Sequence, residues 1–388
     1  LSATHMPMQL IPFLAVRPQW LQSTRSSPEG LAESRAPASS PRLGAVSATG
    51  SNIARTALKR SWRAAIHGVV TGIGFGTWAW GNQLLWGYRS ETDDPELKAT
   101  FAAAVAAGLQ LVDTADSYGT GRLNGRSEEL LGQCLEGLEL SSRTNLIVAT
   151  KLAPFPWRLG RRGLVKAFRA SRQRLRGQLD RVQLHWSTAR YAPWQERPLL
   201  DGLADLVDQG EVRELGVSNV GPQRLRLLHD HLARRGVRLA SVQVQLSLLA
   251  PEPIRPGGIL DVCRNLGVEV LAYSPLALGV LARRPGWTPS DATLLRSGLF
   301  RRLLPGSLPL RQAMADMAQA RGVNQVQVAL NWCRAHGTCP IPGFRRPAQV
   351  EDAKQALRWT LTQQERSRLD QLSLDCPVRM PDHPFQSA

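Results

Sequence analysis

The sequence has 388 residues, of which 43% are hydrophobic and 20% charged, enough to bury the core of one large α/β domain with an appendage or of two ordinary domains. The formal net charge is +17, but only five of the 48 basic residues are Lys and the Arg residues are spread along the chain, so we expect no nucleic-acid partner. No stretch approaches the roughly 18 uninterrupted apolar residues of a transmembrane helix, and none is expected.

The first sixty or so residues differ in composition from the rest. They contain nine Ser, and Glu29 and Glu33 are their only acidic residues. A basic, Ser-rich and acid-poor composition is typical of an organelle transit peptide, with a low-complexity disordered tail as the alternative. We therefore expect residues 1–64 to be a transit-peptide-like or disordered extension, residues 65–375 a single folded domain and residues 376–388 a C-terminal tail.

From Val70 onward, short apolar runs alternate with longer amphipathic stretches. The runs are rich in Val, Ile or Leu and are bounded by turn formers or charge, as buried parallel strands are. The expected strands are Ile73–Thr77, Leu109–Asp113, Leu146–Thr150, Val182–His185, Glu214–Val217, Ser241–Gln245, Val268–Tyr273 and Thr338–Ile341. The expected helices are Pro95–Ala107, Glu128–Leu138, Leu200–Gln209 and Gln223–Arg235.

The spacing of the strands decides between two architectures. Four successive units end at Asp113, Lys151, His185 and Ser218, which lie 33 to 38 residues apart. This regularity favours a closed (β/α)8 TIM barrel, in the α/β class, over an open doubly wound sheet, whose G-x-G-x-x-G fingerprint the sequence lacks. Residues 277–308 are rich in Gly, Pro and Arg, and we expect an irregular functional loop or lid there.

Neither the Cys nor the His residues indicate a metal site. The five Cys form no C-x-x-C pair, which argues against both zinc and a disulfide framework, so we expect reduced thiols. His229 and His231 lie on an expected helix without further ligands nearby. No metal is expected.

Polar residues follow several expected strands at their C-terminal ends, where the active site of a barrel lies. They are Asp113, Lys151, His185, Ser218, Asn219, Gln243 and Tyr273, and Tyr118 follows in the loop D-T-A-D-S-Y-G. Each alone has an ordinary explanation, such as a cap, a surface charge or a core histidine. Charged residues that close three successive units are costly to bury unless they meet, so we expect one shared polar site.

Seven runs resemble, in order, the signatures of the aldo-keto reductase family. They are L-V-D-T-A-D-S-Y-G, S-E-E-L-L-G, V-A-T-K-L, Q-L-H-W, G-V-S-N, V-Q-V-Q and A-Y-S-P-L, within about Gly72 to Leu372. The segments F-P-W-R-L-G-R, P-I-P-G and R-W-T-L-T are similar to the uncharacterised chloroplast oxidoreductase branch of plants and algae. The resemblance implies NADPH-dependent reduction of a small aldehyde or ketone to an alcohol. The composition of residues 1–64 favours a plastid location, with the cytoplasm as the alternative.

The resemblance implies a role for each catalytic residue. Tyr118 is the general acid that protonates the carbonyl oxygen, although a free phenol with a pKa of about 10 is a weak acid near pH 7. Lys151 favours the ionised phenol and so lowers that pKa, and Asp113 holds Lys151 in place. His185 orients the carbonyl oxygen with a hydrogen bond.

The cofactor contacts implied by the resemblance begin at the later strand ends. Ser218, Asn219 and Gln243 match the residues that hold the nicotinamide carboxamide, and Tyr273 matches the ring that stacks on the nicotinamide. The loop along the pyrophosphate begins with Ser274, Pro275 and Leu276.

The adenosine end is expected in P-I-P-G-F-R-R-P-A-Q-V-E-D. Arg345 or Arg346 is the expected partner of the 2′-phosphate, because guanidinium binds phosphate in a bidentate manner; a solvated basic pair is the alternative. Gln349 and Asp352 are expected beside the adenine.

Two departures from the family pattern stand out. Trp186 is followed by Ser187 where Trp-Pro is usual, and R-R-P-G, which begins at Arg283, replaces a T-G-K-Y run. The second departure leaves open whether this loop clamps the cofactor. The alternative function is a cofactor-binding regulatory or scaffold subunit of the same fold with little turnover.

Overall fold

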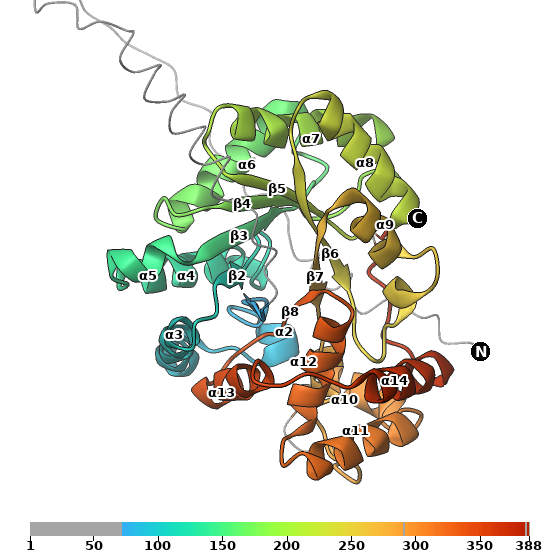
Figure 1. The fold of residues 1–388 in the computed structure, drawn as a ribbon. Helices are drawn as coiled ribbons and strands as arrows, with labels where there is room; N and C mark the ends of the chain where they lie inside the picture. Colours follow the sequence, from blue (N-terminus) through green and yellow to red (C-terminus); the bar gives the residue numbers. More distant parts are fainter. Residues whose placement is uncertain (1–71, 290–291, 385, 388) are drawn as a thin grey trace, which may run out of the picture. The chain divides into compact units, whose positions relative to one another are not determined.

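The computed structural model describes residues 72–289, 292–384 and 386–387, so the expected extension over 1–64 lies outside the described residues. Within them, eight parallel strands pair in chain order, with helices packed outside (Figure 1). The strands are β1 (Phe75–Gly76), β2 (Leu111–Asp113), β3 (Ile147–Leu152), β4 (Arg181–Leu184), β5 (Glu214–Ser218), β6 (Leu239–Gln245), β7 (Glu269–Tyr273) and β8 (Cys339–Ile341). Gly76 N–H donates to Pro342 O at 2.9 Å, which joins β1 to the segment after β8. The predicted (β/α)8 barrel is confirmed.

Helices follow each strand and return the chain to the start of the next. They are α2 (Gln83–Trp86), α3 (Ser90–Ala106), α4 (Arg126–Glu136), α5 (Leu140–Thr144), α6 (Gly160–Arg174), α7 (Pro193–Asp208), α8 (Pro222–Arg234), α9 (Ile259–Leu266), α10 (Leu294–Leu303), α11 (Leu308–Ala320), α12 (Gln325–Ala335), α13 (Pro347–Ala356) and α14 (Gln363–Asp375). Short 3-10 turns lie at Gly121–Leu123, Glu252–Ile254 and Ala277–Gly279.

Three expected boundaries are wrong by more than two residues, and the first is the start of α3, which lies at Ser90 rather than Pro95. The segment 277–308 is not irregular throughout, because α10 occupies Leu294–Leu303 and buries Leu299 and Phe300. The helix expected from Leu200 begins instead at Pro193. The sequence pattern missed its first turns because they are largely exposed and lack the apolar spacing of the later turns; Trp194, for example, is 69% exposed.

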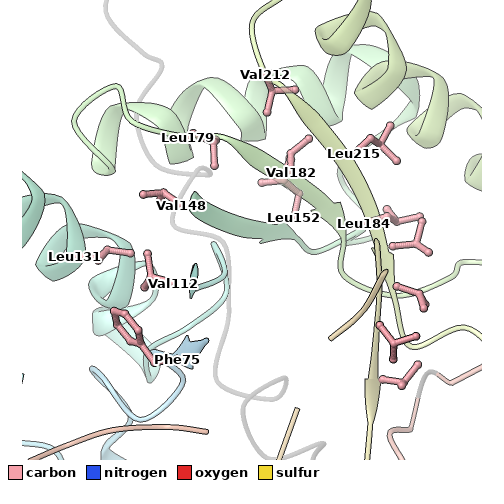
Figure 2. Close-up of a cluster of buried hydrophobic side chains, with 14 of the residues drawn as sticks. Phe75, Val112, Leu131, Val148, Leu152, Leu179, Val182, Leu184, Val212 and Leu215 are labelled. Atoms are coloured by element: carbon pink, nitrogen blue, oxygen red, sulfur yellow. The ribbon is translucent and has the colours of Figure 1, made fainter. Parts of the chain in front are cut away.

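Successive side chains of a strand point to opposite sides, and here the two sides form different layers. Outward-facing Val112, Val148 and Val182 are fully buried beneath the helices (Figure 2). The inward-facing residues include an apolar layer of Leu111, Ala149, Leu271, Cys339 and Ile341. This layer separates the two ends of the barrel interior.

A buried ion cluster fills the end of the barrel at which the strands begin. Arg181 is 3% exposed and pairs with Glu214 at 2.6 Å and Glu269 at 2.8 Å. All three are the first residues of their strands. The opposite end is left for the polar residues identified in the sequence.

Candidate active site

Four inward-facing side chains form a hydrogen-bonded layer at the C-terminal ends of β2, β3, β4 and β6. The Lys151 ammonium pairs with Asp113 Oδ2 and donates to Thr114 O at 2.7 Å. Gln183 Nε2 and Gln243 Nε2 each donate to Asp113 Oδ1 at 2.9 Å. Lys151 is 1% exposed and Asp113 2%, so each charge has lost its water and depends on these partners.

Tyr118 and His185 lie directly above this layer. Lys151 Nζ is 4.8 Å from the centroid of the Tyr118 ring. The Tyr118 and His185 rings meet edge to face with centroids 5.9 Å apart, and Ser117 Oγ lies 3.3 Å from His185 Nδ1. The structure thus brings the four expected catalytic residues together at one end of the barrel.

Burial and the Lys151 charge set the ionisation of this group. Burial raises the pKa of Tyr118 above its usual value, while the Lys151 charge opposes the rise; the net direction is upward, not the lowering expected from Lys151 by itself. Burial would lower the pKa of Lys151, but Asp113 outweighs it and the pKa is raised. Burial, and then the nearby charges of Lys151, His383 and Arg158, hold the pKa of His185 well below its usual range. At neutral pH, Lys151 is therefore charged and His185 neutral.

The residues expected around the nicotinamide form a second hydrogen-bonded group beside the first. Tyr273 OH donates to Asn219 Oδ1 at 2.8 Å, and Asn219 Nδ2 donates to His185 O at 2.9 Å. Ser218 Oγ donates to Gln243 O at 3.1 Å. Asn219 has a φ of +58°, a conformation that Asn tolerates better than most residues. These contacts link the ends of β5, β6 and β7 to the catalytic group.

The loop after β7 has a strained backbone. Ser274, Ala277 and Leu278 all have φ between +48° and +55°, although none is Gly. Pro275 and Leu276 lie between them. Such conformations cost of order 1–3 kcal/mol each and cluster where a backbone approaches a ligand. The strain is consistent with the expected path along a pyrophosphate.

Three arginines gather on aromatic rings beside this loop. The Arg296 guanidinium lies 4.3 Å from the centroid of Trp86, and Arg345 lies 5.8 Å from the same ring. Arg283 stacks on Trp287 at 4.1 Å. Burial, reinforced by Arg283 and Arg345, lowers the pKa of Arg296 to about 10.

This cluster fits the phosphates of a dinucleotide. Among the described residues no carboxylate pairs with Arg283 or Arg296, and the buried Nε atoms of both have no hydrogen-bond partner. Buried cations are ordinarily paired, so an anionic ligand is the missing partner that the donor set favours. Sequence reasoning missed Arg283 and Arg296 because it treated 277–308 as a loop; the helical spacing of L-L-R-S-G-L-F could have identified α10.

The other expected adenosine contacts lie at the start of α13 or point to neighbouring helices. Arg346 is 71% exposed and Arg345 33%, so Arg345 is the one of the pair that faces the cluster. Gln349 Oε1 accepts from Arg345 N–H at 2.7 Å and so caps α13. Asp352 accepts from Asn324 Nδ2 at 2.5 Å. Gln349 and Asp352 are thus already engaged within the protein.

Aromatic side chains from the loops after β3 and β4 form a wall next to His185. The Trp186 ring lies 5.0 Å from His185, and its Nε1 donates to Tyr191 OH at 2.9 Å. Phe155 meets Trp186 edge to face at 6.0 Å and stacks on Trp157 at 4.7 Å. We call these four residues, Phe155, Trp157, Trp186 and Tyr191, the aromatic wall.

The C-terminal tail returns to the same end of the barrel. Met380 N–H donates to Leu249 O at 2.8 Å, and Ser387 N–H donates to Asn219 O at 3.3 Å. His383 lies 6.2 Å from the Trp186 ring. Local sequence pattern did not indicate these tail contacts, because the segment has no period of its own.

Two further features of the described residues concern metal binding and membrane insertion. No cluster of three or more His, Cys, Asp or Glu there has the arrangement of a metal site. None of the helices described is both long enough and apolar enough to cross a membrane.

Comparisons with known proteins identify the family of the chain. A model of the aldo/keto reductase family matches residues 72–374. The chain is 48% identical over 323 residues to the chloroplastic pyridoxal reductase of Arabidopsis thaliana, covering 82% of this chain and 87% of that one. It is 32% identical over 300 residues to the 6-dehydroglucose reductase of Novosphingobium aromaticivorans, covering 74% and 89%.

Solved structures show the same likeness. An aldo-keto reductase of Klebsiella pneumoniae in complex with NADPH is 27% identical with a TM-score of 0.60, covering 81% of this chain and 94% of that one. The glycerol dehydrogenase of Gluconobacter oxydans is 27% identical with a TM-score of 0.64, covering 80% and 94%.

Proposed function

The chain belongs to the aldo/keto reductase family, and we propose that it uses NADPH to reduce an aromatic aldehyde of the pyridoxal type to the corresponding alcohol. The broader function, carbonyl reduction by an NADP(H)-dependent oxidoreductase, rests on the family and on its NADPH-bound relative. These findings favour the enzyme over the regulatory subunit. The observation that carries the narrower proposal is the 48% identity to a pyridoxal reductase over 82% of the chain.

The aromatic wall supports the same substrate class. Trp186 is 4% exposed and is fixed through Tyr191, whose OH in turn donates to Pro154 O at 3.0 Å. A rigid aromatic surface 5.0 Å from His185 suits a planar ring whose aldehyde faces the catalytic group. Aromatic pairs contribute about 0.5–1.5 kcal/mol beyond the area they bury, so a planar substrate gains affinity there.

We assign the proton chemistry to the buried catalytic group. Bound NADPH supplies the hydride that adds to the carbonyl carbon. Tyr118 gives its phenolic proton to the carbonyl oxygen, and the Lys151 charge stabilises the phenolate left behind. Neutral His185 donates a hydrogen bond to that oxygen and fixes its position as charge develops. Asp113 keeps Lys151 charged and in place.

The cofactor contacts are part of the proposal. Ser218, Asn219, Gln243 and Tyr273 are the residues we assign to the nicotinamide end. The cluster of Arg283, Arg296 and Arg345 is assigned to the phosphates, because within the described chain Arg283 and Arg296 have no carboxylate partner and Arg345 has only Asp93, at 3.9 Å. A 2′-phosphate adds about −1.5 to −2 charge at neutral pH, so this cluster favours NADPH over NADH.

The experiment is a rate comparison with purified protein. We expect kcat/KM for pyridoxal to exceed that for a short aliphatic aldehyde by about tenfold or more, from stacking and ring burial together. Trp186→Leu is expected to reduce this ratio while leaving aliphatic turnover nearly unchanged. Turnover of aliphatic aldehydes with none of pyridoxal would refute the substrate assignment.

We also propose that the protein acts in plastids. The support is the composition of residues 1–64 and the chloroplastic relative. A fusion of residues 1–64 to a fluorescent protein is expected to enter plastids in a plant cell. A fusion that stays diffuse in the cytosol would contradict the proposal.

A further inference from the structure

The catalytic loop contains a second buried carboxylate with no role in the proton chemistry described above. Asp116 lies between Asp113 and Tyr118, and its side chain is completely buried. Its carboxylate accepts from Ala153 N–H at 3.1 Å and pairs with the Arg158 guanidinium. Its backbone N–H donates to Lys151 O at 3.0 Å.

Arg158 completes a closed set of contacts around the end of β3. The Nη1 that meets Asp116 also donates to Ala153 O at 2.6 Å, so this pair engages both the backbone N–H and the backbone C=O of Ala153. The guanidinium lies 4.8 Å from the Phe155 ring, at the base of the aromatic wall. Arg158 is 18% exposed and lies in the segment F-P-W-R-L-G-R.

We propose that Asp116 and Arg158 are a positioning pair for carbonyl reduction: their ion pair holds the loop that carries Tyr118 against the strand end that carries Lys151. It is a second ion pair between these two segments, beside that of Lys151 with Asp113, and it lies farther along both of them. Misplacing reacting groups by about 1 Å can cost about a hundredfold in rate, so such a frame affects kcat.

Arg158 also acts on His185 through its charge. The groups that hold the pKa of His185 down, after burial, are Lys151, His383 and Arg158. Burial lowers the pKa of His383 itself to about 4. Removing the Arg158 charge therefore raises the pKa of His185, and the acidic limb of kcat/KM against pH moves to higher pH. Repeating the profile with His383→Gln assigns the shift to His185.

The test compares Asp116→Asn, Arg158→Met and the double variant. Asparagine keeps the size of the side chain and an acceptor for Ala153 N–H but removes the charge. We expect Asp116→Asn to lower kcat about tenfold or more, with KM for the carbonyl and Kd for NADPH changed by less than about threefold. The double variant is expected to recover part of kcat, because Arg158 is no longer left beside a neutral partner.

Arg181→Met is the matched control. Arg181 is also ion-paired and is more buried than Arg158, with 3% against 18% of its side chain exposed, but it lies at the other end of the barrel. The Arg181→Met variant is expected to be less stable than the wild type, with kcat and the pH profile of kcat/KM unchanged. If Asp116→Asn does not fold, the test is a comparison of Arg158→Lys with Arg158→Met. Lys keeps the positive charge, so Arg158→Lys is expected to retain the acidic limb of the wild-type profile of kcat/KM against pH. Variants of Asp116 and Arg158 that lose stability as Arg181→Met does, with wild-type kcat, KM and pH profile, would overturn the proposal.

Discussion

Asp113→Asn removes one charge from the most buried ion pair of the site, and the structure allows its effect to be worked out. Lys151 is 1% exposed, and its other partners in the described chain are the neutral Thr114 O and the Tyr118 phenol. Gln183 and Gln243 donate to the same carboxylate, so the substitution weakens three contacts at once. Breaking a buried pair by removing one partner costs about 3–5 kcal/mol, and we expect a loss of that size at pH 7.

The pH dependence of this stability loss shows whether the unpaired charge of Lys151 causes it. In the wild type the pKa of Lys151 is raised in the folded protein. The contribution of Lys151 to folding stability is therefore fully present below the ordinary Lys pKa of about 10.4, and it is lost only as the pH rises through the higher pKa of the folded state. Without Asp113, burial dominates and lowers the folded pKa. The folded variant then binds fewer protons than the unfolded chain, and its stability rises by at most about 1.4 kcal/mol per pH unit up to about pH 10.

The assay is urea unfolding of wild type and variant, followed by Trp fluorescence at pH 7, 8 and 9. The stability difference is expected to shrink as the pH rises. Asp201→Asn is the control, because its partners Arg161 and Arg235 are 52% and 23% exposed, so water can solvate their charges once the carboxylate is gone. A difference that stays constant from pH 7 to 9 would refute the argument from an unpaired buried charge.

Three further predictions follow from the same geometry. Tyr118→Phe is expected to lower kcat about 100-fold or more with NADPH affinity unchanged, measured by steady-state kinetics and fluorescence titration; near wild-type turnover would remove Tyr118 from the acid role. In Gly216→Ala the added Cβ lies 2.5 Å from Ser241 Oγ, so we expect a loss of about 1–3 kcal/mol in urea unfolding, and no relief by Ser241→Ala would contradict the clash. Arg345→Ala is expected to weaken NADPH binding about tenfold, an effect that shrinks as salt is added, and Arg346→Ala is expected to weaken it less than about threefold. Equal effects of the two substitutions would show that the greater burial of Arg345 does not give it a larger role in binding.

Most of the barrel could be predicted because the signals that define it are local. Each strand is a short apolar run between turn residues, and each helix repeats its apolar positions within a few turns. The observed β4 and β7 therefore agree with the expected strands to within one residue. Residues at strand ends could be predicted to meet, because parallel strands of a barrel all end at one rim.

Only the tertiary structure decided which side chains share one partner. Gln183 lies two residues before His185, so the alternation along β4 could have identified it as inward-facing, but its contact with Asp113 depends on the register between strands. Arg296 and Arg345 lie far apart in sequence and meet near one Trp ring only because β7 and β8 are neighbours.

The sequence by itself thus determined the order of the elements and the types of residue at the barrel rim. It did not determine the net direction of the Tyr118 pKa or the return of the tail to Asn219. The physical reason is that burial and long-range contacts depend on the environment that the whole fold creates, which no local pattern encodes.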